Sequence, residues 1–119
     1  MNSGYLLNTS MSKKYHAVYT KAKLAVDEKV LHSLMSLGIV GGPTSLSKAL
    51  GNNTSYWACM RNREYGLNIG SLVLLQARLA KMLDDASEIR ERARYRSALD
   101  VVKDAIQEKC RLRELELLA

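Results

Sequence analysis

Apolar residues recur at three- and four-residue steps in two long stretches of the chain, and this spacing predicts amphipathic helices. In the first stretch, residues 15–37, the repeating positions are Val18, Ala22, Ala25, Val26, Val30, Leu31, Leu34 and Leu37. Gly38 follows directly and is expected to end that helix. The second stretch, residues 88–118, carries similar spacing among many more charges. Its apolar face needs a partner, either a second copy of the chain or the preceding helices of the same chain.

The composition favours helix over sheet along the whole chain of 119 residues. The chain contains one proline, no phenylalanine and few runs of β-branched residues, which predicts an all-α protein with one compact helical bundle. The proline lies in the run Gly-Gly-Pro-Thr at 41–44, the strongest helix breaker in the sequence. A short helix over 45–50 is expected after it, capped by the hydroxyl of Thr44 or Ser45.

Two further helices are expected between this short helix and the C-terminal stretch. The run Gly-Asn-Asn at 51–53 predicts a sharp turn, because these residues tolerate left-handed backbone. Asn53 or Thr54 is expected to cap a helix over 55–63. The next helix should start near residue 70, with an apolar ridge at Leu72, Leu75, Leu79 and Leu83.

Charge is distributed unevenly along the sequence. Residues 1–81 contain ten Lys and Arg against three Asp and Glu, whereas residues 82–119 contain eight against nine. Clustered cations favour binding to a polyanion such as DNA, because binding releases counterions from its phosphates. The alternative is that the net charge of +6 merely keeps the protein soluble. Charge alone does not separate these two interpretations.

The sequence holds no pattern that predicts a catalytic or metal site. Cys59 and Cys110 lie far apart and no CxxC pair is present, so neither a zinc site nor a disulfide framework is expected. Motifs of phosphate-binding loops, zinc proteases and Ser-His-Asp hydrolases are also lacking. No stretch approaches the ~20 apolar residues of a membrane span. We therefore expect a cytoplasmic protein that is not an enzyme and uses no cofactor, metal or small-molecule ligand.

The segment 46–60, Leu-Ser-Lys-Ala-Leu-Gly-Asn-Asn-Thr-Ser-Tyr-Trp-Ala-Cys-Met, combines apolar anchors with a small residue and a turn glycine. It resembles the helix-turn-helix of the lambda-repressor-like (Xre/Cro-type) DNA-binding family. The family's anchor, small-residue and turn positions fall on Leu46, Ser47, Leu50, Gly51, Trp57 and Met60. The sequence departs from the family at Ser47, where alanine is commonest. It also departs at Asn52, where the family has an apolar residue, and at Arg61, where an acidic residue is usual.

The resemblance implies that the second helix of the motif enters the major groove while the first lies against phosphate. The residues implied to contact DNA are Thr44, Ser45, Lys48, Asn53, Thr54, Ser55, Tyr56, Arg61, Asn62 and Arg63. Ala58 and Cys59 are expected on the same face. Asn53 is expected to pair with adenine, and Arg61 or Arg63 to reach guanine or the backbone. The alternative is a structural helical hairpin that does not contact DNA.

Three parts of the chain are expected on this interpretation. They are a flexible basic arm over 1–14, a helix-turn-helix DNA-binding domain over 15–84 and a dimerisation helix over 85–119. The chain would be a transcriptional regulator, a homodimeric repressor of phage or mobile-element type that binds an inverted repeat in double-stranded DNA. The alternatives are a protein-interaction module that uses the C-terminal helix, such as an antitoxin or phage adaptor, and a nonspecific nucleic-acid binder.

Overall fold

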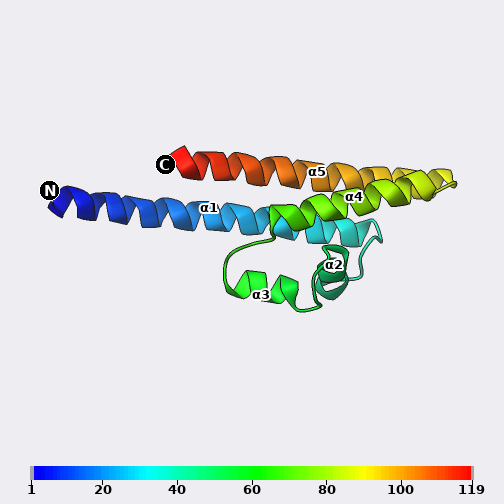
Figure 1. The fold of residues 1–119 in the computed structure, drawn as a ribbon, viewed down its shortest axis with the longest axis horizontal. Helices are drawn as coiled ribbons and strands as arrows, with labels where there is room; N and C mark the ends of the chain where they lie inside the picture. The colour runs from blue at the N-terminus through cyan, green and yellow to red at the C-terminus, as the bar shows by residue number, and fades with distance from the viewer. Residues whose placement is uncertain (1, 119) are drawn as a thin grey trace.

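The computed structural model describes the backbone of residues 2–118 and the side chains of residues 17–118. The regular elements of this part are the helices α1 (Asn2–Ser36), α2 (Pro43–Ala49), α3 (Tyr56–Asn62), α4 (Ile69–Asp85) and α5 (Ile89–Leu118). The all-α prediction is confirmed for the described residues. The three longer helices lie along one direction, with α2 and α3 together on one side of them (Figure 1). The molecule is elongated, with extents of 65 × 25 × 20 Å.

Helix α5 runs back along both α1 and α4 and is antiparallel to each (Figure 1). Five of its apolar residues are buried in the core between these helices. They are Ala98, Leu99, Val102, Ala105 and Leu112. The neighbouring helices contribute Val30, Leu31 and Leu34 of α1 and Leu72, Leu75 and Leu79 of α4. The apolar face of α5 between residues 98 and 112 is therefore covered within the chain, which is the second of the two alternatives given above for its partner, whereas Ile89, Leu117 and Leu118 near its ends are exposed.

Helix α1 begins earlier in the chain than the apolar pattern indicated. The pattern predicted a start near residue 15 and a flexible arm over 1–14, whereas α1 runs from Asn2 to Ser36 without interruption. Residues 2–14 contain no proline, and extending an existing helix costs far less free energy than nucleating a new one. Gly38 ends α1 as predicted, with φ of +70°, and the Ile39 N–H donates to the Leu34 carbonyl at 2.9 Å.

The predicted cap of α2 by the hydroxyl of Thr44 or Ser45 is not formed, and that prediction was wrong. Of the two residues predicted to cap the next helix, Asn53 does accept a backbone N–H at its start, that of Ser55. Pro43 opens α2, because the fixed φ of proline suits the first helical position, and Gly42 before it has no side chain to cap with. Ser55 precedes α3 without a side-chain hydrogen bond to the helix. Its amide and hydroxyl instead donate to Oδ1 of Asn53, at 3.2 and 2.8 Å. Asn53 thus shapes the turn that leads into α3.

Candidate nucleic-acid interface

The inner faces of α2 and α3 are joined by one small polar side chain. Ser47 is fully buried, and its Oγ donates to the Pro43 carbonyl at 2.8 Å. The same Oγ accepts a hydrogen bond from the backbone N–H of Trp57 at 3.0 Å. The apolar anchors Leu46 and Leu50 lie on either side, also buried. A larger residue than Ser47 would separate the two helices, which explains the small residue at this position.

Ser47→Ala is expected to lower the free energy of unfolding by about 1–3 kcal/mol, because it leaves the buried Trp57 N–H without an acceptor. Urea unfolding followed by circular dichroism measures this loss. Ser45→Ala is the matched control, because Ser45 lies two residues away on α2, is exposed and accepts only the exposed Gly41 N–H, at 3.3 Å. Equal stability of the two variants would show that Ser47 is a space filler only.

The turn between α2 and α3 is fixed against α4. Gly51 has φ of +79°, and a Cβ there would lie 2.5 Å from Cδ2 of Leu74 on α4. The side-chain Nδ2 of Asn52 donates to the Leu50 carbonyl at 3.2 Å and to Oγ of Ser71 on α4 at 3.1 Å. The polar residue that departs from the family pattern at 52 therefore makes a polar link to α4, in place of an apolar contact.

The outward faces of α2, the turn and α3 are exposed together. The predicted contact residues on them are Thr44, Ser45, Lys48, Asn53, Thr54, Ser55, Asn62 and Arg63, and all eight are exposed. Along α3, the exposed positions Ser55, Ala58, Cys59 and Asn62 follow the three- and four-residue spacing of a single helix face. We call these four residues the outer stripe of α3.

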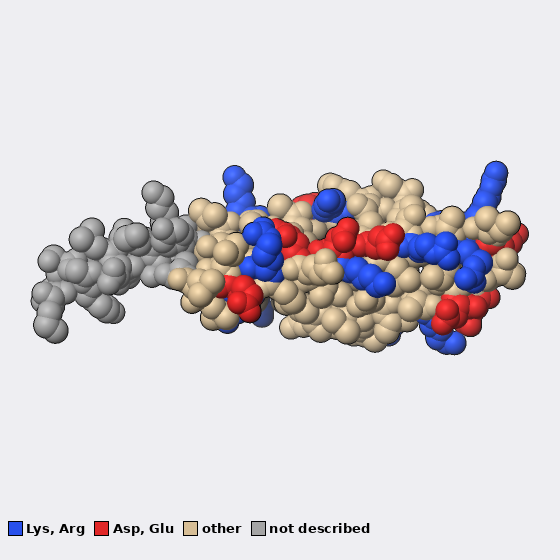
Figure 2. All heavy atoms as spheres, turned by 90° about the horizontal axis from the view of Figure 1, so that it is seen from above, with Lys and Arg blue, Asp and Glu red and all other residues tan. Residues whose placement is uncertain are grey.

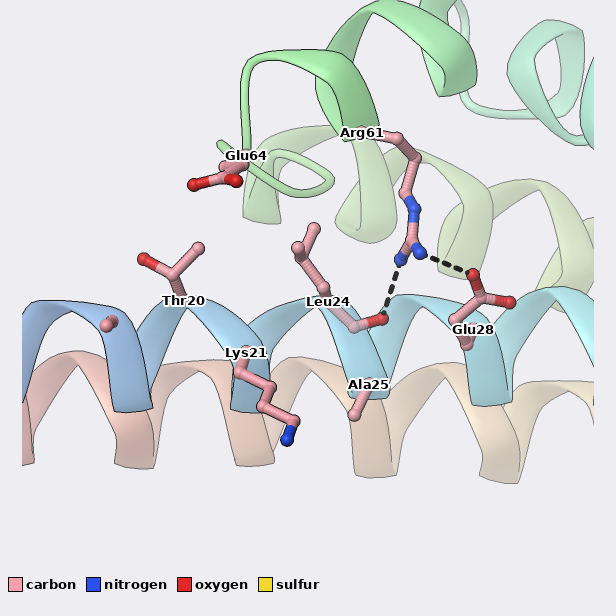
Figure 3. Close-up of a pocket in the computed structure, with 8 residues that line it drawn as sticks. Thr20, Lys21, Leu24, Ala25, Glu28, Arg61 and Glu64 are labelled. Carbon is pink, nitrogen blue, oxygen red and sulfur yellow. Dashed lines mark hydrogen bonds and ion pairs between the residues drawn. The ribbon is translucent and has the colours of Figure 1, made fainter.

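Two of the predicted contact residues point away from this surface. The hydroxyl of Tyr56 accepts a hydrogen bond from the Asn68 N–H at 2.9 Å, which ties α3 to the start of α4. Arg61 reaches toward α1 (Figure 3), where it pairs with Glu28 at 2.8 Å and donates to the Leu24 carbonyl at 3.3 Å. Its guanidinium also lies 5.7 Å from the centre of the Trp57 ring. Both side chains position α3 on the rest of the molecule.

An open groove of about 530 Å³ separates α3 from α1 beside this ion pair. Figure 3 shows Thr20, Leu24 and Glu28 of α1 on one side and Arg61 of α3 on the other. The groove lies at the inward end of Arg61 and so does not overlap the outer stripe.

The exposed surface of α2 and α3 lacks acidic side chains. No Asp or Glu occurs in the sequence between Glu28 and Glu64, and the outward surface of α2, the turn and α3 carries Lys48 and Arg63. Arg78 of α4 adds a third exposed cation, and its guanidinium donates to the Lys48 and Ala49 carbonyls at 3.0 Å each. A helix C-terminus with a bound arginine has its negative dipole end neutralised. The surface from Thr44 to Arg63 therefore carries no negative side chain, and exposed Glu64 follows at its edge.

A buried polar cluster at the other end of α3 was missed in the sequence. Nζ of Lys109 on α5 lies 2.5 Å from Oδ1 of Asp27 on α1, and both side chains are at most 5% exposed. Oδ2 of Asp27 accepts the Leu67 N–H at 2.8 Å, and Lys109 donates to the Leu67 carbonyl at 2.7 Å. We call these three residues the Asp27 cluster. It fastens the loop after α3 to both α1 and α5.

Burial is the largest influence on the pKa values of Asp27 and Lys109. Desolvation raises the pKa of Asp27, and the attraction of Lys109 opposes that rise. Desolvation likewise lowers the pKa of Lys109, against the attraction of Asp27. Gly66 makes room for the pair, since a Cβ there would lie 2.9 Å from Oδ2 of Asp27 and its φ is +74°.

The sequence did hold a signal for this cluster. Asp27 lies three residues before Val30 and seven before Leu34, on the inward stripe of α1. Lys109 occupies the corresponding place between the buried Ala105 and Leu112 of α5. When one apolar stripe contains a single acidic residue and another contains a single basic residue, a buried ion pair is indicated, because an unpaired buried charge is strongly unfavourable.

Comparison of the chain with protein-family models, with curated proteins and with solved structures gave no match. Within the described residues, His, Cys, Asp and Glu side chains form no group of three that could hold a metal ion. Cys59 and Cys110 are both free and exposed. None of the described helices combines the length and the apolar character that crossing a membrane requires.

Proposed function

We propose that this chain is a sequence-specific regulator that binds double-stranded DNA through α2, the turn and α3. The observation that carries the proposal is the surface described above, an exposed, acid-free face whose inner side is fixed to the core. A protein that lies against phosphate needs such a face, because an acidic side chain there would repel DNA. On this proposal the segment is a helix-turn-helix, with α3 as the helix that enters the major groove.

On this proposal the predicted residues have three roles: contact with bases, contact with phosphate, and shaping of the turn. The outer stripe of α3 faces the base edges, with Asn62 as its strongest hydrogen-bonding side chain. Thr44, Ser45, Lys48 and Arg63 flank the stripe and contact phosphate. Asn53 has its amide oxygen bound to Ser55, so its task is to shape the turn.

The proposal includes a homodimer that binds an inverted repeat and represses by occupying it, as the resemblance to lambda-repressor-like proteins implies. Two copies related by a two-fold axis present two α3 helices to two half-sites, which raises both affinity and specificity over one copy. Because α1 and α4 cover the apolar face of α5 between residues 98 and 112, we do not assign the dimer contact to that part of α5.

The experiment that tests the proposal compares Asn62→Ala with Lys48→Ala in binding to the preferred duplex. Loss of a base contact by Asn62→Ala is expected to cost about 1–3 kcal/mol on the preferred sequence and little on unrelated DNA. Loss of a phosphate contact by Lys48→Ala should weaken binding to all sequences alike and reduce the salt slope by about 1. Fluorescence anisotropy over a salt series measures both quantities.

Lys103→Ala is the matched control, because Lys103 is an exposed lysine on α5, away from the α2 and α3 surface. It should leave both affinity and sequence preference unchanged. The interaction-module alternative places the working surface at the end of α5, where Leu117 and Leu118 are 67% and 80% exposed. That alternative predicts that none of the three variants changes binding to DNA.

A further inference from the structure

The outer stripe of α3 carries no charged side chain. It consists of the exposed residues Ser55, Ala58, Cys59 and Asn62. The cations nearest in sequence lie off the stripe, since Arg61 is bound to Glu28 of α1 at 2.8 Å and Arg63 follows the last helical residue. The face of the molecule turned away from α2 and α3 differs, because Lys and Arg occur there together with Asp and Glu (Figure 2). The outer stripe is therefore an uncharged part of a surface whose cations lie beside it.

Arg61, the cation of α3 itself, is held on the opposite side of the helix. It lies four residues after Trp57, so both side chains are on the inner face. Its guanidinium lies 5.7 Å from the centre of the Trp57 ring and donates to the Leu24 carbonyl at 3.3 Å. Turning Arg61 toward DNA would break these contacts and the ion pair with Glu28. The stripe therefore meets base edges without an arginine.

The side chains of the stripe suit A·T base pairs better than G·C pairs. In the major groove, guanine presents two acceptors that Arg or Lys binds, and cytosine presents a donor that Asp or Glu binds. The stripe contains neither kind of side chain. Adenine presents an acceptor beside a donor, which the amide of Asn62 can pair with, and thymine presents a methyl group that suits Ala58. Ser55 can bond to either pair, and the thiol of Cys59 is only a weak donor.

From these observations we infer that α3 selects A·T base pairs in the major groove, with Asn62 on adenine and Ala58 on the thymine methyl group. The inference rests on the proposed function and adds the class of DNA sequence that the protein prefers. Ser55 and Asn62 lie about 10 Å apart along the helix at about 1.5 Å per residue. At about 3.4 Å per base-pair step, each half-site is expected to contain a core of about three or four A·T pairs.

Competition between two pools of synthetic duplexes tests the inference. The cores of one pool contain only A·T pairs in random order and those of the other only G·C pairs, with identical lengths and flanks. At near-physiological salt, the A·T pool should displace a fluorescent duplex of random sequence from the wild type at about tenfold lower concentration, since a good base contact discriminates by at least about this factor. Equal or better competition by the G·C pool overturns the inference.

Two modified A·T pools locate the preference in the major groove. One contains uracil in place of thymine, which removes the methyl group, and the other contains 7-deazaadenine, which removes the N7 acceptor. Both should bind the wild type several-fold more weakly than the unmodified pool. The narrow minor groove of A-tracts also attracts cations. If both modified pools bound as tightly as the unmodified one, the minor groove would be the source of the preference and the inference would be overturned.

Asn62→Ala should bind the 7-deazaadenine pool and the unmodified A·T pool equally, because the variant has no amide to pair with N7. Gln107→Ala is the matched control, since Gln107 is an exposed amide on α5. It should keep the wild-type difference between the two pools, and circular dichroism checks that both variants are folded. A wild-type difference in Asn62→Ala would contradict the contact of Asn62 with adenine.

Failure of the proposed function gives a different result from failure of the inference. If the protein does not recognise sequence, no sequence is enriched from a pool that contains all four bases. If it recognises sequence but does not select A·T pairs, one sequence is enriched and G·C pairs occupy the centre of each half-site. The first result contradicts the proposed function, and the second overturns the inference alone.

Discussion

Lys109→Met is expected to lower the free energy of unfolding by about 3–5 kcal/mol, because it leaves the carboxylate of Asp27 buried without its cation. The side chain of Asp27 is only 1% exposed, so its carboxylate depends on Nζ of Lys109 for compensation of its charge. The same change removes the hydrogen bond to the Leu67 carbonyl, which loosens the loop that follows α3. Chemical denaturation at neutral pH measures the loss.

Two further variants distinguish the effect of leaving a buried charge unpaired from the effect of losing any lysine. Lys103→Met removes an exposed lysine from the same helix and should change stability by less than about 0.5 kcal/mol. The double variant Asp27→Leu with Lys109→Met should recover part of the loss, since no charge then remains buried. A loss below about 1 kcal/mol for Lys109→Met would contradict a stabilising role for the pair.

Trp57→Ala is expected to cost about 3–5 kcal/mol and to release α3 from the molecule. Trp57 is the buried residue of α3, at 8% exposure, and its ring also lies against Arg61. Without the ring, α3 loses the apolar contact that holds its outer stripe in place. Amide hydrogen exchange should become fast over 56–62 while α5 stays protected, and specific binding to DNA should be lost.

Tyr65→Ala is the control for removal of an aromatic side chain, because Tyr65 is 69% exposed in the loop after α3. It should leave the exchange rates of α3 and the binding to DNA near their wild-type values. If α5 lost its protection together with α3 in Trp57→Ala, then α3 would be part of the same cooperative unit as the three long helices.

The fold was largely predictable because helix periodicity and breakers are local properties of the sequence. The ridge at Leu72, Leu75 and Leu79 is buried as expected, and Gly38 and Gly51 both have the positive φ that their turns require. The length of α1 was not predictable in this way. Residues 2–14 lack an apolar period, so the pattern gave no reason to extend the helix through them.

The candidate surface was predicted only in part, because the roles of long polar side chains depend on tertiary contacts. The motif placed Ser55 on the outer face, and Asn62 was expected among the DNA contacts; both are exposed. Arg61 was expected on that face too, but Glu28 lies within reach on α1 and holds it at 2.8 Å. The distance in sequence between these two residues leaves no local signal of their pairing. For Asp27 the sequence held only an indirect signal, one charged residue in the apolar stripe of α1 and one of opposite sign, Lys109, in that of α5.

The most direct test of the account is a selection of random duplex DNA against the purified protein at near-physiological salt. The account predicts enrichment of one sequence with inverted-repeat symmetry, bound specifically by the wild type and with lower preference by Asn62→Ala. Recovery of no common sequence, with binding that disappears steeply as salt rises, would contradict it. The positive surface of α2 and α3 would then be a nonspecific binder of nucleic acid.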